Sequence, residues 1–236
     1  MRGYFITATG TEIGKTVVAA AIANAARRAG SRVAVFKPAV TGLVDHRLAP
    51  ETWARARELP DHALLRLAAG STQGDDEIAP YRYGPPVSPH LAAELAGERI
   101  DPDRLLGAAL AATEDADLLV CEGVGGFLVP LTAGYLVRDL ARDLALPVAI
   151  VAAAGLGTIN HTLLTVDSVR GAGLEVACVV LNRWPDRPSV MERSNLETIE
   201  RLGRVSVDTL PELDLRRPES WPGLAPVRTE RRLEAA

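Results

Sequence analysis

Short, fully apolar runs recur along the chain, and segments with helical periodicity separate them. The runs are rich in Val, Ile, Leu and Ala and do not alternate with polar residues, which is typical of strands buried on both faces of a parallel sheet. The predicted strands are 4–7, 33–36, 117–121, 147–153, 175–181 and 205–210. The order of strands and helices, without internal repeats, predicts one α/β domain with a doubly wound, mainly parallel sheet and helices on both faces.

The periodic segments between the strands predict the helices. The expected helices are 17–29, 61–69, 91–96, 102–113, 135–144, one running from about 158 to 172, and 189–202. Residues 43–60 have no clean period and are expected to form a loop, with a partly helical segment as the alternative, and residues 71–89 are rich in turn formers. We expect the domain to span residues 1–213, and residues 214–236, rich in Pro, Arg and Glu, to form a loosely held tail.

The first strand leads into the sequence Thr-Ala-Thr-Gly-Thr-Glu-Ile-Gly-Lys-Thr, residues 7–16, and a helix follows. A strand, a glycine-containing loop ending in Gly-Lys-Thr and a helix are typical of a phosphate-binding loop, in which backbone N–H groups and the helix N-terminus surround phosphate oxygens. Lys15 would reach the β- and γ-phosphates, and the Thr16 hydroxyl would bind Mg²⁺. The usual first glycine of the motif is replaced by Thr9, with Ala8 before it, so a chance Gly-Lys-Thr is the alternative interpretation.

Composition narrows the function. A net charge of −4 and a pI near 5.6 argue against nucleic acid as the main partner. The sequence shows neither a secretion signal nor an apolar stretch long enough for a membrane helix, which predicts a cytoplasmic protein. Cys121 and Cys178 lie inside apolar strands and are expected to be buried thiols, neither a disulfide nor a metal pair.

Lysine is almost absent from this chain. Of 26 basic residues, only Lys15 and Lys37 are lysines, and the other 24 are arginines. A compact ammonium and a planar guanidinium are not interchangeable at a phosphate. Both lysines follow predicted strands, which favours a shared role over coding bias, although an ordinary strand-end cation remains the alternative for Lys37.

Other polar residues also follow predicted strands. Because ligands of open α/β sheets bind outside the carboxyl ends of the strands, Thr41, Glu122 and Asn182 are expected at the same edge as the phosphate loop. Glu122 precedes a glycine-rich turn and resembles the second carboxylate of phosphate-loop enzymes, the alternative being a turn or capping acid. Asp61 begins a predicted helix and is either its N-cap or a metal ligand. The turn at 155–160 opens another helix and offers an anion site.

Taken together, these segments resemble the dethiobiotin synthetase family over about 200 residues. The motifs that carry the resemblance are residues 11–16, 37–42, 86–90, 122–126 and 156–161, and Asn182. The family's phosphate loop has the spacing seen here, with Gly usually where this chain has Ala8, and Val124 replaces the family's usual Ala. Residues 43–60 are longer than usual, so Asp45 stays open as the alternative to Asp61.

The resemblance implies an activity and a site. The reaction would be ATP-dependent carboxylation and ring closure of 7,8-diaminononanoate with CO₂, giving dethiobiotin, ADP and phosphate through an N-carbamate and a carbamic–phosphoric anhydride. Family enzymes are homodimers with substrate at the subunit interface. By resemblance, the catalytic residues are Lys37, Lys15 and Thr11; the metal ligands for Mg²⁺ are Thr16, Asp61 and Glu122; the substrate residues are Thr41, Gly157, Thr158 and Asn160; and the nucleotide residues are Glu12, Ile13, Gly14, Lys15, Thr16, Val17, Glu122, Gly123, Val124, Gly125, Asn182, Pro211, Glu212 and Leu213.

Two other classes share parts of this pattern. A partitioning ATPase of the same superfamily carries a signature lysine five residues before the loop lysine, where this chain has Gly10. A cobyrinate-type amide ligase usually adds a glutamine amidotransferase domain, for which 236 residues leave no room. Both are disfavoured.

Overall fold

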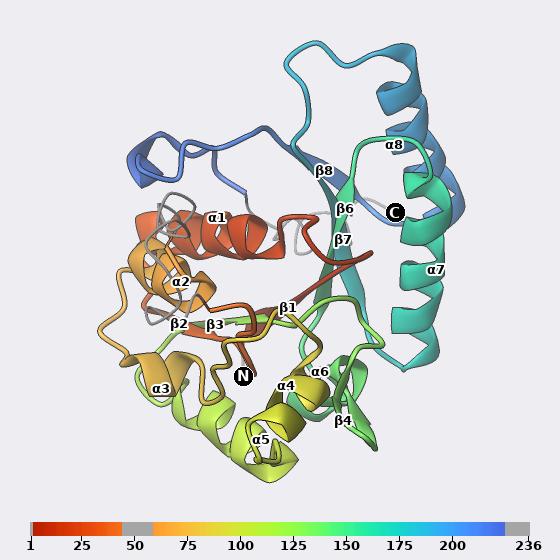
Figure 1. The fold of residues 1–236 in the computed structure, drawn as a ribbon. Helices are drawn as coiled ribbons and strands as arrows, with labels where there is room; N and C mark the ends of the chain where they lie inside the picture. Colours follow the sequence, from red (N-terminus) through yellow and green to blue (C-terminus); the bar gives the residue numbers. More distant parts are fainter. Residues whose placement is uncertain (1, 44–58, 225–236) are drawn as a thin grey trace, which may run out of the picture.

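The computed structural model describes residues 2–43 and 59–224, and its centre is a six-stranded sheet in the order β2-β3-β1-β6-β7-β8 (Figure 1). Every pairing in this sheet is parallel. The strands are β1 (Gly3–Ala8), β2 (Val33–Phe36), β3 (Leu118–Glu122), β6 (Val148–Ala153), β7 (Val176–Asn182) and β8 (Val207–Leu210). The order reverses direction at β1, so the doubly wound parallel sheet predicted from the sequence is confirmed.

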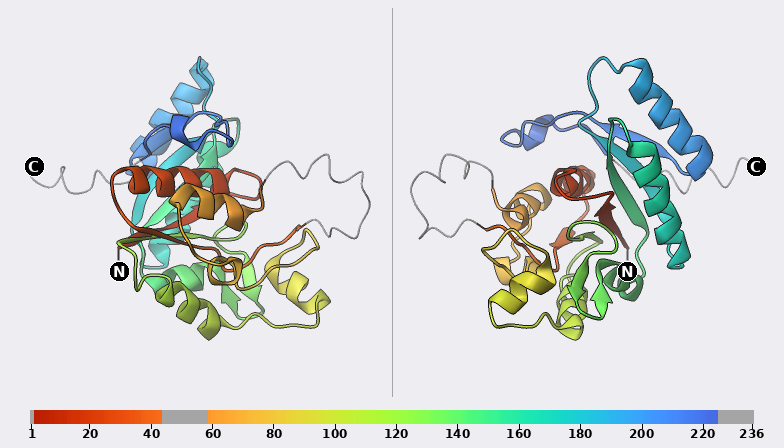
Figure 2. Two further views of the ribbon diagram at one scale, coloured as in Figure 1. Left: turned by 90° about the vertical axis from the view of Figure 1, so that its left-hand side faces the viewer. Right: turned by 45° about the vertical axis from the view of Figure 1, so that its right-hand side comes forward.

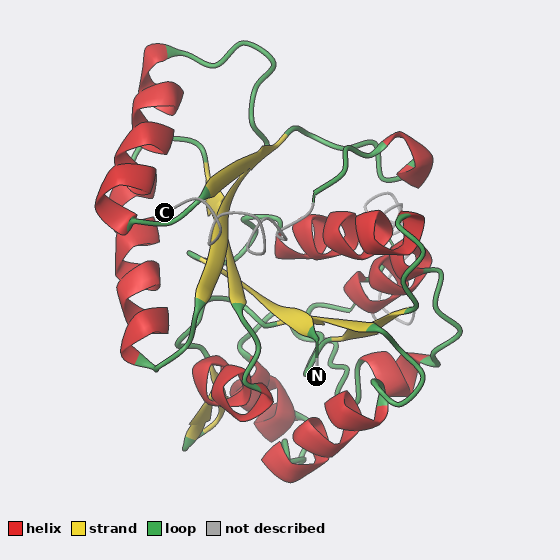
Figure 3. Ribbon diagram, turned by 180° about the vertical axis from the view of Figure 1, so that it is seen from behind, coloured by secondary structure: helices red, strands yellow, loops and turns green. Residues whose placement is uncertain are grey.

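Helices cover both faces of the sheet (Figure 3). One face carries α1 (Lys15–Arg28) and α2 (Asp61–Ala69), and its apolar residues form one core cluster. Helices whose apolar residues join the cluster on the other face are α4 (Pro89–Leu95), α5 (Pro102–Ala111), α6 (Val137–Leu144), α7 (Thr158–Gly171) and α8 (Val190–Gly203). Because each strand is sandwiched between these clusters, the uniformly apolar runs of the sequence are explained.

Two small features were not anticipated. Residues 71–89, expected to be all turns, contain the four-residue helix α3 (Asp75–Ile78). A two-stranded antiparallel ribbon pairs β4 (Pro130–Thr132) with β5 (Tyr135–Leu136), so the predicted helix 135–144 begins two residues later, as α6. Segments this short carry too few residues for a periodic pattern. Helix α1 also begins at Lys15 rather than at Val17.

The expectation of a loosely held tail is wrong for residues 214–224. The chain after β8 turns towards α1 and forms the short 3₁₀ helix η2 (Pro218–Ser220) beside it (Figure 2). Trp221 and Leu224 are 2% and 6% exposed within the α1-side cluster. The segment is rich in charged residues and proline, which suggested a tail, and its two buried apolar residues were therefore not predicted. Within the described ranges, none of the helices is long and apolar enough to span a membrane.

Candidate active site

The phosphate-binding loop connects β1 to α1 as predicted. Gly14 immediately precedes α1 with φ 95°, and the Lys15 ammonium donates to the carbonyl of Gly10 at 3.2 Å across the loop. Lys15 is 8% exposed, and this burial lowers its pKa. The loop therefore presents the start of a helix and a partly desolvated ammonium, which together favour a polyanion.

Ala8 occupies the position where related loops have Gly, and its backbone explains why alanine fits. Ala8 is the last residue of β1, pairs with Val151 of β6 and is 1% exposed. The left-handed residues of the loop are instead Glu12, with φ 58°, and Gly14. The extended backbone of Ala8 can be adopted by any residue, so glycine is not required there. Glu12, by contrast, has a positive φ, which is uncommon for a residue with a side chain.

Lys37 lies at the centre of a buried ionic cluster at the carboxyl ends of β2 and β3. Its ammonium is 2.6 Å from Oδ2 of Asp61 and 2.6 Å from Oε1 of Glu122. The Thr16 hydroxyl donates to the same Oε1 at 2.9 Å. Four residues that are distant in the sequence thus meet at one edge of the sheet. The strand-end argument predicted this for Lys37, Glu122 and the phosphate loop, but not for Asp61, which begins a helix.

The charges of this cluster depend on one another. Burial opposes the charge of Lys37, but the carboxylates of Glu122 and Asp61 outweigh burial and raise the pKa of the lysine. Burial raises the pKa of Glu122, against the influence of Lys37. Burial opposes the charge of Asp61, but the charge of Lys37 and hydrogen bonds from Lys37 and Thr16 outweigh burial and lower the pKa of this carboxyl. The arrangement keeps Lys37 as an ammonium inside the protein.

Asp61 is the first residue of α2, and its carboxylate points to Lys37. The N-cap position is Pro60, and no side chain caps this helix end. The capping interpretation of Asp61 is therefore wrong, and its place beside Lys37 and Glu122 supports the alternative. Asp45, the other candidate, lies outside the described residues.

The donor set at this edge suits a hard divalent cation. Glu122 Oε2 is buried and has no hydrogen-bond partner in the part of the chain that the structure describes. Together with Asp61 and the Thr16 hydroxyl it offers oxygen ligands only, as Mg²⁺ prefers. Among the described residues, no group of three or more His, Cys, Asp or Glu side chains is placed so that it could hold a metal ion by itself. Two carboxylates and a hydroxyl match an ion that keeps several waters and binds through substrate phosphates.

The segment 73–83 supports β2 and α2 from outside the sheet, because β2 is an edge strand. Gln73 accepts from the N–H of Val35 at 2.9 Å and donates to its carbonyl at 3.1 Å. Two residues along the strand, the N–H of Lys37 donates to the carbonyl of Ile78 at 2.8 Å. The segment thus fixes the backbone that carries Lys37.

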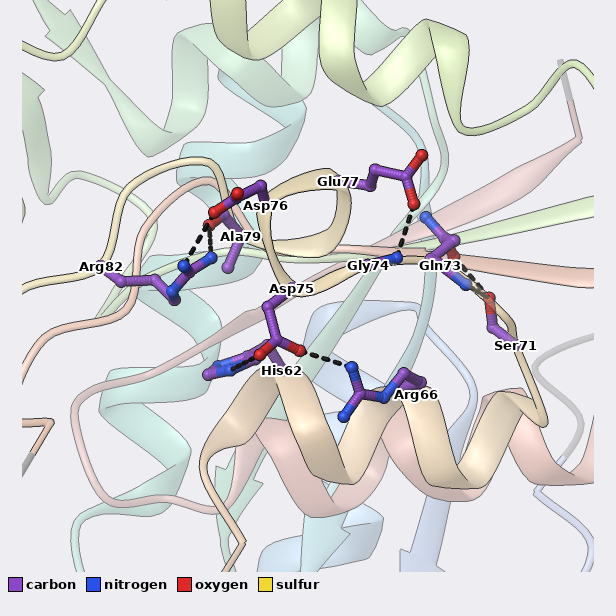
Figure 4. Close-up of polar contacts among 10 residues, drawn as sticks. All are labelled: His62, Arg66, Ser71, Gln73, Gly74, Asp75, Asp76, Glu77, Ala79 and Arg82. Carbon is purple, nitrogen blue, oxygen red and sulfur yellow. Dashed lines mark hydrogen bonds and ion pairs between the residues drawn. The ribbon is translucent and has the colours of Figure 1, made fainter.

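The same segment is joined to α2 by Asp75 (Figure 4). One carboxylate oxygen of Asp75 is 2.5 Å from Nη1 of Arg66, and the other is 3.7 Å from Nε2 of His62, whose pKa burial lowers. His62 adjoins Asp61, so Asp75 connects the helix that carries one cluster carboxylate to the segment that holds Lys37. Sequence reasoning missed this support, since a lone Asp in a turn-rich stretch has no distinctive pattern.

The two glycines Gly123 and Gly125 after β3 are required by close packing. A Cβ on Gly123 would lie 2.9 Å from Cγ1 of Val137, and one on Gly125, where φ is 63°, would lie 2.8 Å from Cγ2 of Val129. Both glycines therefore let the turn after Glu122 pass close to its neighbours. Val124 is half-buried between them.

Asn182 joins the phosphate loop to a second cavity. Its amide nitrogen donates to the carbonyl of Ile13 at 2.9 Å and would lie 2.1 Å from a Cβ on Gly14, so that position requires glycine. Its Oδ1 is buried and has no partner among the described residues. The amide faces a cavity of about 500 Å³ whose lining residues come from α1, from α2 and the residue Leu59 before it, from the end of β7 and from the segments after β7 and β8: Val17, Leu59, Leu64, Leu67, Asn182, Arg183, Glu212, Leu213, Asp214, Leu215 and Arg216.

This cavity contains part of the predicted nucleotide site. Val17, Asn182, Glu212 and Leu213 line it, whereas Pro211 is half-buried just before Glu212. The leucines of α2 and the residues beyond 213 were not anticipated. The leucines were missed because a leucine in a helix is normally assigned to the core. Arg183, which has φ 53°, was missed because nothing in the local sequence marks it as a cavity residue.

The remaining candidates lie on more open parts of the structure. Thr11 is exposed on the phosphate loop and Thr41 is half-buried after β2. At the start of α7, Gly157 has φ 88° and Asn160 is exposed, but the Thr158 hydroxyl is buried against that of Thr162 at 3.3 Å. The Thr158 hydroxyl is therefore engaged within α7, and its backbone N–H donates to the carbonyl of Gly155 at 3.3 Å.

A doubly wound parallel sheet, a Gly-Lys-Thr loop between β1 and α1, and a carboxylate at the end of β3 define the class of P-loop nucleotide-binding proteins. A family model described as an AAA domain matches residues 2–215. The MinD-containing MinC:MinD cell division complex of Aquifex aeolicus has a similar fold, with a TM-score of 0.53 and 15% identity over 100% of this chain and 96% of that one. At that identity the likeness concerns the fold alone.

Closer relatives identify the family. The chain is 44% identical over 192 residues to an ATP-dependent dethiobiotin synthetase of Anaeromyxobacter dehalogenans strain 2CP-C, covering 80% of this chain and 81% of the relative. It is 35% identical over 207 residues to the enzyme of the same name from Bacillus subtilis strain 168, covering 88% and 85%. The chain belongs to the dethiobiotin synthetase family, as its motifs indicated.

Proposed function

We propose that the carboxyl edge of this sheet carries out ATP-dependent carboxylation and ring closure of 7,8-diaminononanoate with CO₂. One amine of the substrate adds to CO₂ and loses a proton, giving an N-carbamate. A carbamate oxygen attacks the γ-phosphorus of ATP and ADP leaves, which gives a carbamic–phosphoric anhydride. The second amine then attacks the carbamate carbon and expels phosphate, closing the cyclic urea of dethiobiotin.

The observation that carries this proposal is the convergence of the chain's two lysines on Glu122. Lys37 contacts Glu122 directly, and Lys15 is close enough for both Glu122 and Lys37 to affect its pKa. Two ammonium groups at one edge of the sheet can stabilise the charge that passes from the carbamate to the γ-phosphoryl oxygens. Phosphoryl transfer depends mainly on such positioning and electrostatic stabilisation.

The site offers a metal ion ligands that are all oxygen atoms. Thr16, Asp61 and Glu122 would hold Mg²⁺ together with the β- and γ-phosphates, and the ion would neutralise charge on those phosphates. The buried Oε2 of Glu122, which has no hydrogen-bond partner among the described residues, supports this assignment. Lys37 would then be directed from the carboxylates towards the transferred phosphoryl group.

The nucleotide would extend from the phosphate loop into the cavity beside Asn182. Backbone groups of residues 12–17 would bind the phosphates, with the turn 123–125 alongside. The apolar side chains of Val17, Leu64 and Leu213 suit a planar base. The Oδ1 of Asn182, which has no partner within the described part of the chain, suits an exocyclic amine such as that of adenine.

The diamine would lie beside Lys37, with Thr11 and Thr41 as hydrogen-bond partners. We propose a homodimer in which the start of α7, with Gly157, Thr158 and Asn160, receives the carboxylate of substrate bound mainly to the other subunit. Leu156, next to this helix start, is 94% exposed, which supports a surface that a second copy covers. A cytoplasmic location, where ATP is supplied, belongs to the same proposal.

The test is ADP release by the purified chain with Mg²⁺. We expect turnover only when ATP, 7,8-diaminononanoate and bicarbonate are all present, with dethiobiotin formed in equal amount to ADP. ADP release that is independent of the diamine, or none at all from folded protein, would contradict the proposal. Sedimentation of the same sample tests the dimer separately.

A further inference from the structure

The segment that follows β8 is fastened to the helix of the phosphate loop. Residues 214–221, here called the C-terminal strap, contact α1 through two side chains of that helix. Asn24 donates from Nδ2 to the carbonyl of Pro218 at 2.9 Å, and Arg28 donates from Nη1 to the carbonyl of Trp221 at 3.1 Å. Asn24 is 1% exposed, so its hydrogen bond to the strap is shielded from water.

Trp221 closes the strap on itself. Its indole Nε1 donates to the carbonyl of Asp214 at 2.8 Å, while its ring is 2% exposed in the α1-side core. A buried tryptophan contributes a large apolar contact area and usually satisfies its N–H. The position of Asp214 is therefore set by an anchor seven residues further along the chain.

The anchored end of the strap is also a wall of the cavity beside Asn182. Asp214, Leu215 and Arg216 line that cavity, opposite the leucines of α2. The strap rests on α1, which begins at the phosphate-loop residue Lys15. Because a helix is stiff over this length, the distance between the phosphate loop and the strap wall is fixed by Asn24, Arg28 and Trp221.

We infer that Asn24 and Trp221 are positioning residues for the nucleotide base. Through the strap they set the width of the base cavity relative to the phosphate loop, and so the affinity for the nucleoside half of the nucleotide. This inference rests on the proposed nucleotide site. It assigns to residues 214–221, beyond the expected end of the domain, a part in substrate binding.

The experiment compares two ligands of the intact protein, ADP and inorganic tripolyphosphate, each titrated calorimetrically with Mg²⁺. Asn24→Ala and Trp221→Ala should each weaken ADP binding about tenfold, which corresponds to about 1.4 kcal/mol. Tripolyphosphate contacts only the phosphate loop, so its binding should change less than about twofold. In turnover, the KM for ATP should rise with little change in kcat or in the KM for the diamine, the signature of lost uniform binding.

Two further variants make the result decisive. Trp221→Phe keeps most of the buried ring and loses the Asp214 hydrogen bond, and it should give an intermediate loss for ADP. Glu219→Ala, on the exposed side of the strap, should behave as wild type. Unchanged ADP binding in Asn24→Ala and Trp221→Phe, or an equal loss for ADP and tripolyphosphate, overturns the inference. A wild-type protein that binds neither ligand would instead refute the proposed nucleotide site.

Discussion

The ammonium of Lys37 lies 2.6 Å from Oε1 of Glu122, and neither side chain is more than 4% exposed. A buried charge without its partner is strongly destabilising, whereas a paired and hydrogen-bonded one persists. This explains why the chain keeps a lysine here while using arginine almost everywhere else. One ammonium here contacts the carboxylates of Asp61 and Glu122 at 2.6 Å each, and a planar guanidinium is larger.

Replacing Lys37 with arginine should therefore abolish most activity. We expect kcat to fall by about 10²–10³-fold, the usual effect of removing one group that stabilises developing charge. ADP affinity should stay close to wild type, because the base cavity and the phosphate loop remain intact. Rapid-quench measurement of phosphate release and calorimetry with ADP check the two halves of this prediction.

Arg32 provides the matched control. It pairs with Asp117 at 2.9 Å in an exposed position, so Arg32→Lys exchanges the same two cations outside the site. This variant should retain full activity. Wild-type turnover by Lys37→Arg would refute a role for Lys37 at the transferred group.

Asp61→Asn should make the enzyme need more Mg²⁺. The amide keeps the size of the side chain but loses the charge that pairs with Lys37 and would bind the ion. We expect the Mg²⁺ concentration for half-maximal rate to rise about tenfold, equivalent to about 1.4 kcal/mol of binding. The binding of Mn²⁺ in the presence of ADP, followed by electron paramagnetic resonance, gives a readout that is independent of turnover. If Asp45→Asn shows this change and Asp61→Asn does not, the ligand has been wrongly assigned.

Asp75 should influence the same metal dependence from a distance. Asp75→Asn weakens the link from segment 73–83 to α2 and is expected to raise the Mg²⁺ requirement by only about two- to threefold, because the ion pair with Arg66 is partly exposed. Asp76→Asn is the control, since Asp76 pairs with Arg82 on the solvent side and is 84% exposed. Equal effects of the two variants would mean that Asp75 does not act through α2.

The sequence was sufficient to predict the site residues that lie at the carboxyl end of a strand. Lys37 and Glu122 each follow an apolar run, and parallel strands bring their carboxyl ends to one edge, so their meeting could be predicted without coordinates. The contact that adds to the need for glycine at position 14 could not be predicted. It arises because Asn182, 168 residues later, places its amide nitrogen 2.1 Å from where a Cβ of residue 14 would lie. Contacts between distant segments depend on the packed structure rather than on local pattern.

The cavity beside Asn182 could likewise be predicted only in part. Asn182 was predicted because it follows a strand. The other lining residues include leucines of α2 and residues of the strap. The sequence pattern assigns the leucines to the core and the strap to a tail. Trp221 anchors the strap in the core. A single tryptophan among charged residues and prolines gives no periodic pattern from which its burial could be predicted. Tertiary burial outweighed local composition at this point.

Gly14→Ala tests the contact between the phosphate loop and Asn182. The new Cβ would lie 2.1 Å from Nδ2 of Asn182 at a φ of +95°, so both the clash and the backbone conformation oppose it. We expect a loss of about 1–3 kcal/mol in the free energy of unfolding, together with weaker ADP binding. Adding Asn182→Ala should recover the part due to the clash and leave the part due to φ. A double-mutant cycle by urea denaturation separates the two, and strictly additive losses would contradict the contact.

The Asp117–Arg32 pair predicts a specific acid dependence of stability. The guanidinium and the backbone N–H of Arg32 both donate to Asp117 and lower its pKa to about 2. An acid whose pKa is lowered in the folded protein adds stability above its ordinary pKa near 3.8, and this stability disappears as the pH falls towards 2. Asp117→Asn should therefore unfold at lower urea concentration than wild type at pH 7, and the gap should shrink between pH 4 and pH 2. The pair is exposed, so salt should reduce the gap at pH 7 as well. A gap that stays constant from pH 7 to pH 2 would show that the Asp117 charge contributes nothing.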